Sequence, residues 1–163
     1  MRWRDFVAGF RPAVPPPAAP AEEQADLVEI FKAERRMELK RQGRVLRSYR
    51  VSLGFAPRHH KEREGDGRTP EGLYAIDARN PRSSFHLSLR VSYPDATDRA
   101  RAAERGEDPG GDIFIHGLPN GWRKWRTPHG RRDWTAGCIA VTDAEIREVW
   151  SLVPTGALVR IHP

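Results

Sequence analysis

The sequence contains very little cysteine. Of its 163 residues only Cys138 carries a thiol, so no disulfide can form within the chain. This excludes a small scaffold held together by disulfides, and the fold must depend on a hydrophobic core, for which the length is sufficient. Because a lone cysteine is more often a small core residue than a nucleophile, a chemical role for Cys138 needs support from its neighbours.

Long apolar runs are also missing. No stretch approaches the roughly 18 consecutive apolar residues of a membrane-spanning helix, so no transmembrane segment is predicted. Arg2 and Arg4 resemble the basic region of a signal peptide. The apolar stretch 6–10, however, is shorter than the roughly 7–15 residues that such a peptide needs. We find no convincing signal peptide, which leaves the route of any export open.

Acidic residues are too few to balance the basic ones. The formal net charge is +6 and the sequence pI is about 10.1. A basic protein can bind nucleic acid, an anionic membrane or another acidic polymer, and charge alone does not choose among them. The arginines are spread along the chain rather than gathered in one arm, which favours an ordinary solvated surface. We therefore do not predict a nucleic-acid partner.

The chain divides into two parts by composition. Residues 1–25 are rich in proline and alanine, a composition that favours polyproline II and predicts a semi-rigid N-terminal tether. Residues 26–163 have the mixed composition of a globular domain. Thr142 to Glu145 has the pattern of a helix-capping box and is followed by apolar residues at helical spacing. A second, polar helix is predicted over 97–105.

Most of the remaining periodicity is that of strands. Alternating or continuous apolar residues predict seven or eight of them, and thus a mainly β domain with one or two short helices. The loop 54–72 is long and rich in glycine, which is uncommon unless a loop is functional. The clearest strands are expected at 27–31, 36–40, 45–53, 73–76, 85–93, 112–115 and 158–161.

His116 and Cys138 are the candidate catalytic pair. His116 stands at the end of a predicted buried strand and precedes Gly117, while Cys138 follows Gly137. A thiol needs an adjacent imidazole to become an effective nucleophile at neutral pH. A glycine before it lets the backbone approach closely. The alternatives are a structural Cys138 and a strand-end His116 satisfied by backbone groups.

Two separated motifs give the pair a family context. The sequence Ile-His-Gly at 115–117 and the sequence Thr-Ala-Gly-Cys-Ile at 135–139 resemble, in order and spacing, the signature of the L,D-transpeptidase (YkuD-like) catalytic domain. The loop agrees independently. Lys61 and the run Gly-Asp-Gly-Arg-Thr-Pro-Glu-Gly at 65–72 resemble another stretch of that family. The resemblance covers residues 26–163 and implies a β-sandwich or barrel.

The resemblance also implies roles for individual residues. Cys138 would be the nucleophile and His116 its general base. Gly137 and Cys138 would form the oxyanion hole, and Thr135 would orient the turn, although Thr135 can also be a plain turn hydroxyl. The substrates would be peptidoglycan stem peptides in the periplasmic cell envelope, with no cofactor and no metal.

One position departs from the family pattern. The second residue after the cysteine is usually Arg or Asn in cross-linking members, but here it is Ala140. Members with an apolar residue there include enzymes that resemble hydrolases releasing a peptidoglycan-bound envelope lipoprotein. Three functions therefore stay open, namely transfer to an amine, hydrolysis of the same bonds, and non-catalytic peptidoglycan binding with a structural Cys138.

The segment between the two motifs mixes tryptophan and arginine. One interpretation is a substrate-binding lid in which Arg131 and Arg132 meet stem-peptide carboxylates beside Trp134 and Gly117. The other is tryptophan packing over the sheet with arginines at its edge. His129 and Asp133 could be combined with the catalytic pair into a zinc site, but no close ligand pair such as Cys-x-x-Cys supports one.

Overall fold

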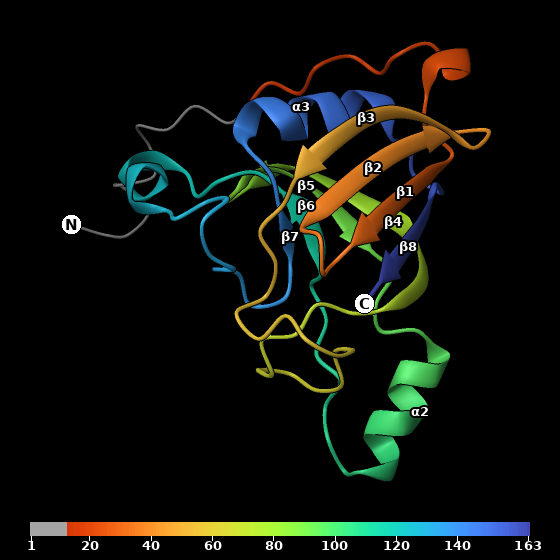
Figure 1. Cartoon of the computed structure of the whole chain (residues 1–163), viewed down its shortest axis with the longest axis vertical. Helices are drawn as coiled ribbons and strands as arrows, with labels where there is room; N and C mark the ends of the chain where they lie inside the picture. The colour runs from red at the N-terminus through yellow and green to blue at the C-terminus, as the bar shows by residue number, and fades with distance from the viewer. Residues whose placement is uncertain (1–12) are drawn as a thin grey trace.

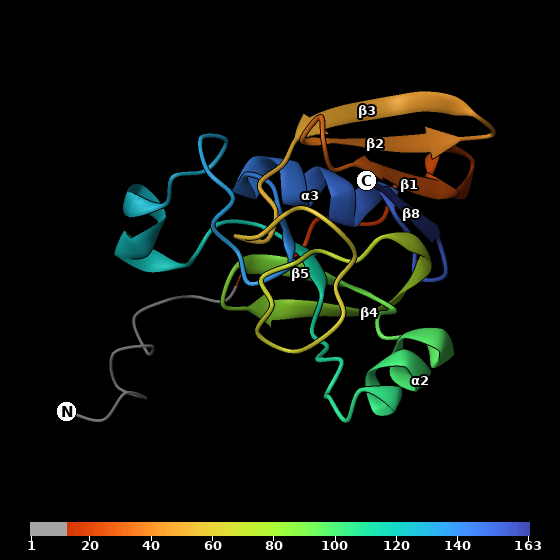
Figure 2. The same ribbon diagram turned by 60° about the horizontal axis from the view of Figure 1, so that its bottom comes forward.

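The computed structural model describes residues 13–163, which fold around one curled eight-stranded sheet. The strand order is β3-β2-β1-β8-β4-β5-β6-β7. Helix α3 lies in the hollow of the sheet, and α2 projects from the opposite end (Figures 1 and 2). The strands are β1 (Leu27–Phe31), β2 (Arg36–Arg41), β3 (Arg44–Arg50), β4 (Gly72–Ser83), β5 (His86–Val91), β6 (Phe114–His116), β7 (Ile139–Ala140) and β8 (Leu158–His162).

The first half of the sheet is organised by β1. This strand pairs antiparallel with β2 and parallel with β8, so that Val28 lies opposite Leu39 on one side and Val159 on the other. All three of these side chains are fully buried. A run of β-branched and apolar residues without proline suits a strand that has a neighbour on each side. The predicted strands 27–31, 36–40 and 158–161 are confirmed.

The two ends of the sheet approach each other next to Cys138. Ser52, just beyond β3, exchanges two backbone hydrogen bonds with Ala140 of β7, at 3.1 and 2.9 Å. Phe55 and Thr135 continue the contact, since the Phe55 N–H donates to the Thr135 carbonyl at 2.9 Å. The sheet is thus curled into a half-barrel, and the prediction of a mainly β fold with few short helices is confirmed.

Helix α3 (Asp143–Leu152) begins where the sequence predicts it. The Thr142 hydroxyl accepts the Glu145 N–H while the Glu145 carboxylate accepts the Thr142 N–H, which completes the capping box. Ile146 and Val149 are fully buried, and the helix packs chiefly against β5. The helix therefore fixes the face of β5 and β6 that leads to His116.

Several element boundaries differ from the sequence-based expectations. The predicted strand 45–53 ends at Arg50, because Ser52 leaves β2 and pairs with Ala140, and the predicted strand 85–93 covers only His86–Val91. Strand β4 runs to Ser83 instead of ending at Ile76, because bulges after Ile76 and Asn80 interrupt the alternation from which its length was predicted. Strand β6 is shorter than expected and begins at Phe114. Two 3-10 segments, η1 (Ala21–Glu23) and η2 (Gly121–Arg126), join the predicted helix α2 (Ala96–Glu104).

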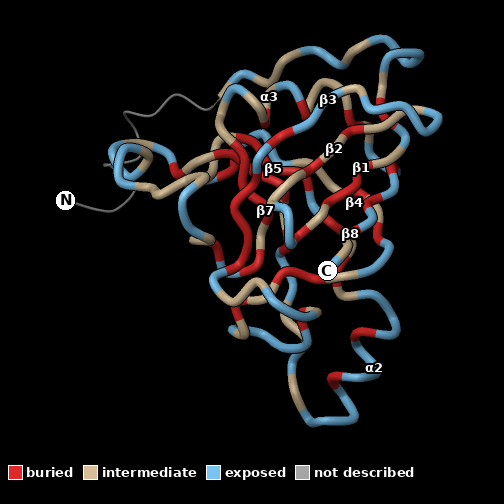
Figure 3. Tube along the Cα trace, in the orientation of Figure 1, coloured by how far each residue is buried: buried red, intermediate tan, exposed pale blue. Residues whose placement is uncertain are grey.

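The described part of the proline-rich segment lies along α3. Arg147 donates to the Val14 carbonyl at 2.8 Å, and the Ser151 hydroxyl donates to the Pro17 carbonyl at 2.8 Å. Residues 1–12 of the predicted tether lie outside the described residues. Figure 3 contrasts the buried strands at the centre with the largely exposed α2. Within residues 13–163 every helix is too short or too polar to cross a bilayer.

Candidate active site

His116 and Cys138 line one open cavity of about 520 Å³, which we call the cysteine cavity. The topology brings them together, because β6 and β7 are parallel neighbours in which His116 lies opposite Ala140, two residues beyond Cys138. Aromatic and proline side chains form much of the wall, and the basic residues Arg123 and Arg126 stand at it. The remaining lining residues are Phe85, Pro119, Trp122, Thr127, Pro128, Trp134, Thr135 and Ala136.

The His116 ring is held in one tautomer. Its Nδ1 lies 2.6 Å from the carbonyl oxygen of Gly117. Because a carbonyl oxygen only accepts hydrogen bonds, Nδ1 carries the proton in the neutral ring, and Nε2 is left with a free lone pair. An imidazole in this state can accept a proton at Nε2. The sequence placed Gly117 next to His116 but did not reveal that its carbonyl orients the ring.

Aromatic side chains surround His116 and remove it from solvent. The Phe85 ring stacks on it with centroids 4.3 Å apart, and the Trp134 ring lies 5.8 Å away. The residue is 3% exposed. Burial lowers the pKa of His116 to about 4, since the imidazolium form loses its hydration, although the Gly117 carbonyl acts in the opposite direction. At neutral pH His116 is therefore a neutral base.

The Cys138 thiol sits partly exposed in the wall of the cavity. Its Sγ accepts the Phe114 N–H at 3.4 Å and donates to the Asp112 carbonyl at 3.4 Å. Burial raises the pKa of Cys138 to about 11, and the Phe114 N–H only partly offsets this. The resting pair is thus a neutral thiol and a neutral imidazole.

Gly137 shapes the turn that presents the thiol. It has φ +142°, and a Cβ at this position would lie 2.8 Å from the Arg68 carbonyl oxygen and 3.1 Å from Ile113 Cδ1. The Thr135 hydroxyl spans the turn, because it donates to the Cys138 carbonyl at 2.7 Å and accepts the Gly137 N–H at 3.1 Å. A side chain at position 137 would therefore displace the turn on which the thiol is carried.

This bonding corrects the expected oxyanion hole. The Gly137 N–H is directed at Thr135 and is not available to a substrate oxygen. The Cys138 N–H, in contrast, has no acceptor among residues 13–163. The geometry therefore leaves Cys138, and not Gly137, with a backbone donor for a developing oxyanion.

The glycine-rich loop 54–72 is hydrogen-bonded to the turn 135–138 that carries Cys138, which we call the cysteine turn. The Thr69 hydroxyl accepts the Gly54 N–H at 3.1 Å and donates to the Gly137 carbonyl at 2.9 Å. Asp66 holds the loop itself, since its carboxylate accepts from Lys61 Nζ at 2.9 Å and from the backbone N–H groups of residues 62, 63 and 68. These hydrogen bonds hold the pKa of Asp66 down at about 2 despite its burial. Asp66 and Thr69 stand in the loop motif, but the motif alone did not predict that they hold the turn.

The predicted substrate-binding residues separate into two groups. Trp134 lines the cysteine cavity, and its Nε1 is buried without a partner among the described residues. Arg131 and Arg132 do not line it and belong to a different cavity. Gly117 does not line it either. It packs against Asp143, and a Cβ at position 117 would lie 2.6 Å from Asp143 Oδ1. Of the cations in the predicted lid, Arg123 and Arg126 do line the cavity, and both lie on η2.

Asp133 and Ala140 also have defined positions. The Asp133 carboxylate is engaged by Arg35 at 2.8 to 3.1 Å and accepts the Leu53 N–H at 3.0 Å. It anchors the loop and does not face the catalytic pair. Over the described residues no three His, Cys, Asp or Glu side chains are grouped as metal ligands would be. Ala140 is 0% exposed and lies outside the cavity wall, so an arginine placed there would enter the packed core.

Comparison with known proteins agrees with this architecture. A model of the L,D-transpeptidase catalytic domain (YkuD) matches residues 25–161. YafK of Escherichia coli, a protein with a provisional assignment as an L,D-transpeptidase, is 32% identical over 146 residues. That match takes in 83% of this chain and 50% of YafK, so the chain spans about half the length of its curated relative.

Solved structures show the same fold at low sequence identity. The helical cell shape determining protein Pgp2 from Campylobacter jejuni is 20% identical, with a TM-score of 0.66 over 98% of this chain and 54% of Pgp2. An L,D-transpeptidase from Mycobacterium smegmatis is 16% identical, with a TM-score of 0.58 over 85% of this chain and 59% of its own. The strand order, the loop motif and the family match agree, and the chain belongs to the L,D-transpeptidase (YkuD) catalytic-domain family.

Proposed function

We propose that this protein is a cysteine acyltransferase that acts on peptidoglycan stem peptides in the cell envelope. The observation that carries the proposal is the shared cavity of His116 and Cys138, in which the Gly117 carbonyl fixes Nδ1 and leaves Nε2 free. A base in the correct tautomer beside a thiol is the arrangement that covalent acyl transfer needs. No cofactor takes part in this chemistry.

The first half of the reaction forms a thioacyl-enzyme. Nε2 of His116 takes the thiol proton while Sγ of Cys138 attacks the carbonyl carbon of the third stem residue. The Cys138 N–H donates to the oxygen that becomes negatively charged. When this intermediate collapses, the C–N bond to the terminal D-alanine breaks. His116 then returns its proton to the departing amine, and free D-alanine leaves.

The second half releases the acyl group. An acceptor amine from another stem attacks the thioester carbon, His116 removes the proton from the attacking nitrogen, and the C–S bond breaks. The departing Sγ regains a proton from His116, which restores the neutral pair. The buried, neutral state of both residues suits this order of proton transfers. In each half of the reaction His116 takes up one proton and gives it back, so no charge remains on the pair.

The charges at the cavity fit the substrate. Arg123 and Arg126 stand at its wall, and stem peptides carry free carboxylates. The apolar wall around Phe85 and Trp134 keeps water from part of the cavity, which strengthens these electrostatic contacts. Stem peptides are thus a better match than a cationic substrate.

A thiol hydrolase of the same bonds is the second candidate. None of the described lining residues is Asp or Glu, so an ammonium-bearing acceptor would meet arginine without a compensating carboxylate. Water is uncharged and would not be repelled by these arginines. The apolar residue Ala140 at the family's polar position agrees with hydrolysis. Under this alternative the substrate would be a stem peptide linked to an envelope lipoprotein.

Product analysis separates the functions. The protein is incubated with tetrapeptide muropeptides, with and without an acceptor amine such as glycinamide, and the products are identified by mass spectrometry. Transfer gives acceptor-linked tripeptide stems in proportion to the acceptor, whereas hydrolysis gives free tripeptide in both reactions. Binding of the muropeptides without any release of D-alanine would support a non-catalytic peptidoglycan-binding module.

A further inference from the structure

A second cavity of about 310 Å³ is lined in part by residues 130–133 of the 127–136 loop, and we call it the arginine cavity. Four arginines line it, and they come from three separate parts of the chain. Gly130 to Asp133 form one wall, while Val51 and Ser52 form another. The arginines are Arg35, Arg50, Arg131 and Arg132.

Most of this positive charge is not neutralised. Asp133 is the one carboxylate in the lining, and Arg35 already binds it through two nitrogens, Nε and Nη2, at 2.8 to 3.1 Å. Arg50 also lines the cavity and donates from Nε to the Gly130 carbonyl at 3.0 Å. Over residues 13–163 the Arg131 and Arg132 side chains meet no acceptor. Three of the four arginines in the lining thus have no carboxylate partner among the described residues.

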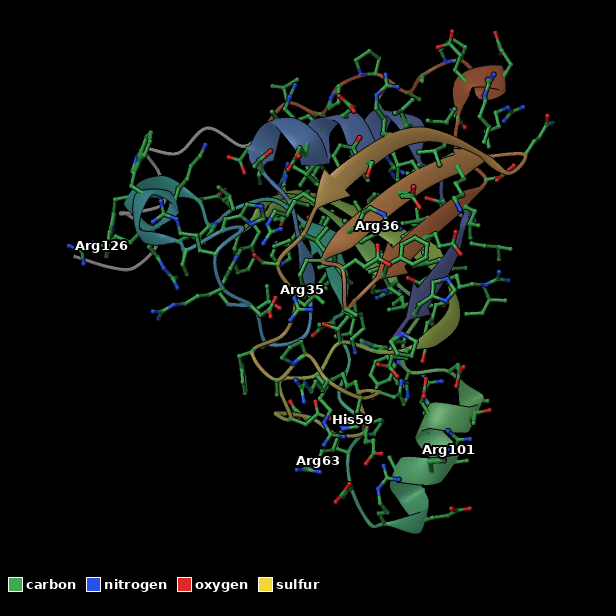
Figure 4. All side chains as sticks on the ribbon, viewed as in Figure 1. Arg35, Arg36, His59, Arg63, Arg101 and Arg126 are labelled. Carbon is green, nitrogen blue, oxygen red and sulfur yellow. The ribbon has the colours of Figure 1, made fainter. Side chains whose placement is uncertain are left out.

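The cavity is distinct from the one that holds the thiol. Neither His116 nor Cys138 lines it, and no residue is shared between the two linings. Figure 4 shows Arg126 of the cysteine cavity at the outer end of the projecting η2 segment, whereas Arg35 lies near the start of β2. Pro128 of the cysteine cavity and Gly130 of the arginine cavity are two residues apart, so one loop contributes to both linings.

We propose that the arginine cavity is a second binding site, which takes an oxyanion group, either carboxylate or phosphate. Planar guanidinium groups bind both in a bidentate manner, and their attraction is greatest in a hollow that limits hydration. The site does not depend on the reaction proposed for Cys138. In a substrate with several carboxylates it would hold a second group while another part reaches the thiol.

Binding of two probes to the wild-type protein tests the site. Inorganic phosphate and the dicarboxylate glutarate, neither of which carries the stem-peptide backbone that the cysteine cavity is proposed to bind, are titrated by calorimetry at low and high salt. The comparison is between Arg131→Gln/Arg132→Gln and Arg123→Gln/Arg126→Gln, two double variants that remove the same charge from the two different cavities. Preference for phosphate or glutarate shows whether the site takes a phosphate or a carboxylate group.

We expect salt-sensitive binding of at least one probe, weakened at least tenfold by Arg131→Gln/Arg132→Gln and by less than twofold by the other variant. Saturating probe should leave alkylation of Cys138 by iodoacetamide within twofold of its free rate. No binding of either probe, or a loss confined to Arg123→Gln/Arg126→Gln, would overturn the proposal. So would a probe that blocks alkylation, since the oxyanion would then occupy the cysteine cavity. None of these readouts requires turnover, so the proposed reaction can fail independently.

Discussion

The turn that carries Cys138 and the η2 segment both line the cysteine cavity and are built in different ways. Around Cys138 the Thr135 hydroxyl makes two hydrogen bonds to the backbone of the turn, and the Thr69 hydroxyl makes one to the Gly137 carbonyl and accepts the Gly54 N–H. Trp122 and Trp125, in contrast, are 61% and 85% exposed on a segment that projects from the body (Figure 1). One wall is held by interior contacts and the other stands in solvent.

This difference separates chemistry from recognition. Attack on a carbonyl needs the thiol, the base and the oxyanion donor within a fraction of an ångström of their positions, which only a rigid turn provides. Recognition of a flexible, charged peptide needs side chains that can adjust, and exposed arginine and tryptophan suit that task. Substitutions in the two walls should therefore have effects of different kinds.

The largest effect is expected at the thiol itself. Cys138→Ala should lower D-alanine release by at least about 10³-fold, because no other nucleophile lines the cavity in the required position. Its melting temperature should stay close to that of the wild type, since a partly exposed thiol contributes little packing. A matched Cys138→Ser variant should also be nearly inactive. Retained release by either variant would show that the fixed wall does not supply the nucleophile.

The next effect concerns pH. Because the pKa of Cys138 is raised to about 11 and that of His116 is lowered to about 4, the free protein holds a neutral thiol throughout the neutral range. Since the reactive thiolate is the minor form below its pKa, iodoacetamide alkylation should rise about tenfold per unit between pH 7 and 9. Intact-mass kinetics measures this directly. A flat, fast rate from pH 5 to 9 would indicate a standing thiolate–imidazolium pair instead.

A smaller effect is expected at the support of the cysteine turn. Thr69→Val leaves the Gly54 N–H and the Gly137 carbonyl unpaired in the interior, which should cost about 1–3 kcal/mol of unfolding free energy. Activity should fall about tenfold as the turn shifts, with kcat more affected than KM.

Thr97→Val on exposed α2 is the matched control, because it makes the same chemical change without a buried partner. It should alter neither stability nor turnover. Equal effects of the two substitutions in urea unfolding would mean that Thr69 does not hold the turn.

The smallest stability effect is expected in the projecting wall. Trp125→Ala should change the unfolding free energy by less than about 0.5 kcal/mol, because the side chain is largely in solvent. Trp150→Ala, in contrast, removes an indole that packs on the core beneath the Arg79 guanidinium and should cost about 2–3 kcal/mol. If both tryptophans proved equally costly, η2 would be part of the folded core.

The sequence predicts the fold well where its periodicity is uninterrupted. The strands around β1 and the capping box of α3 follow from local patterns that the packing does not override. β4 was underestimated because its bulges break the alternation after Ile76. The curling of the sheet depends on the contact between Ser52 and Ala140, which no local pattern contains.

The candidate site was predictable in its chemical groups and less so in its contacts. His116 and Cys138 stand in a motif, so their identity is local information. Arg131 and Arg132 were assigned to the substrate from their position in the sequence between the two motifs, but the loop turns at Gly130 and places them at the arginine cavity. The role of the Gly137 N–H could not be read from the sequence either, because it depends on where the Thr135 hydroxyl points.

The proposed function depends most directly on acylation of Cys138. Wild-type protein is mixed with a tetrapeptide muropeptide, quenched in acid within the first turnover, and measured by intact-mass and peptide mass spectrometry. We predict an added mass equal to the substrate minus D-alanine, carried by the peptide that contains Cys138 and formed together with an equal amount of free D-alanine. Release of D-alanine with no adduct on Cys138, and at the same rate from Cys138→Ala, would contradict the account.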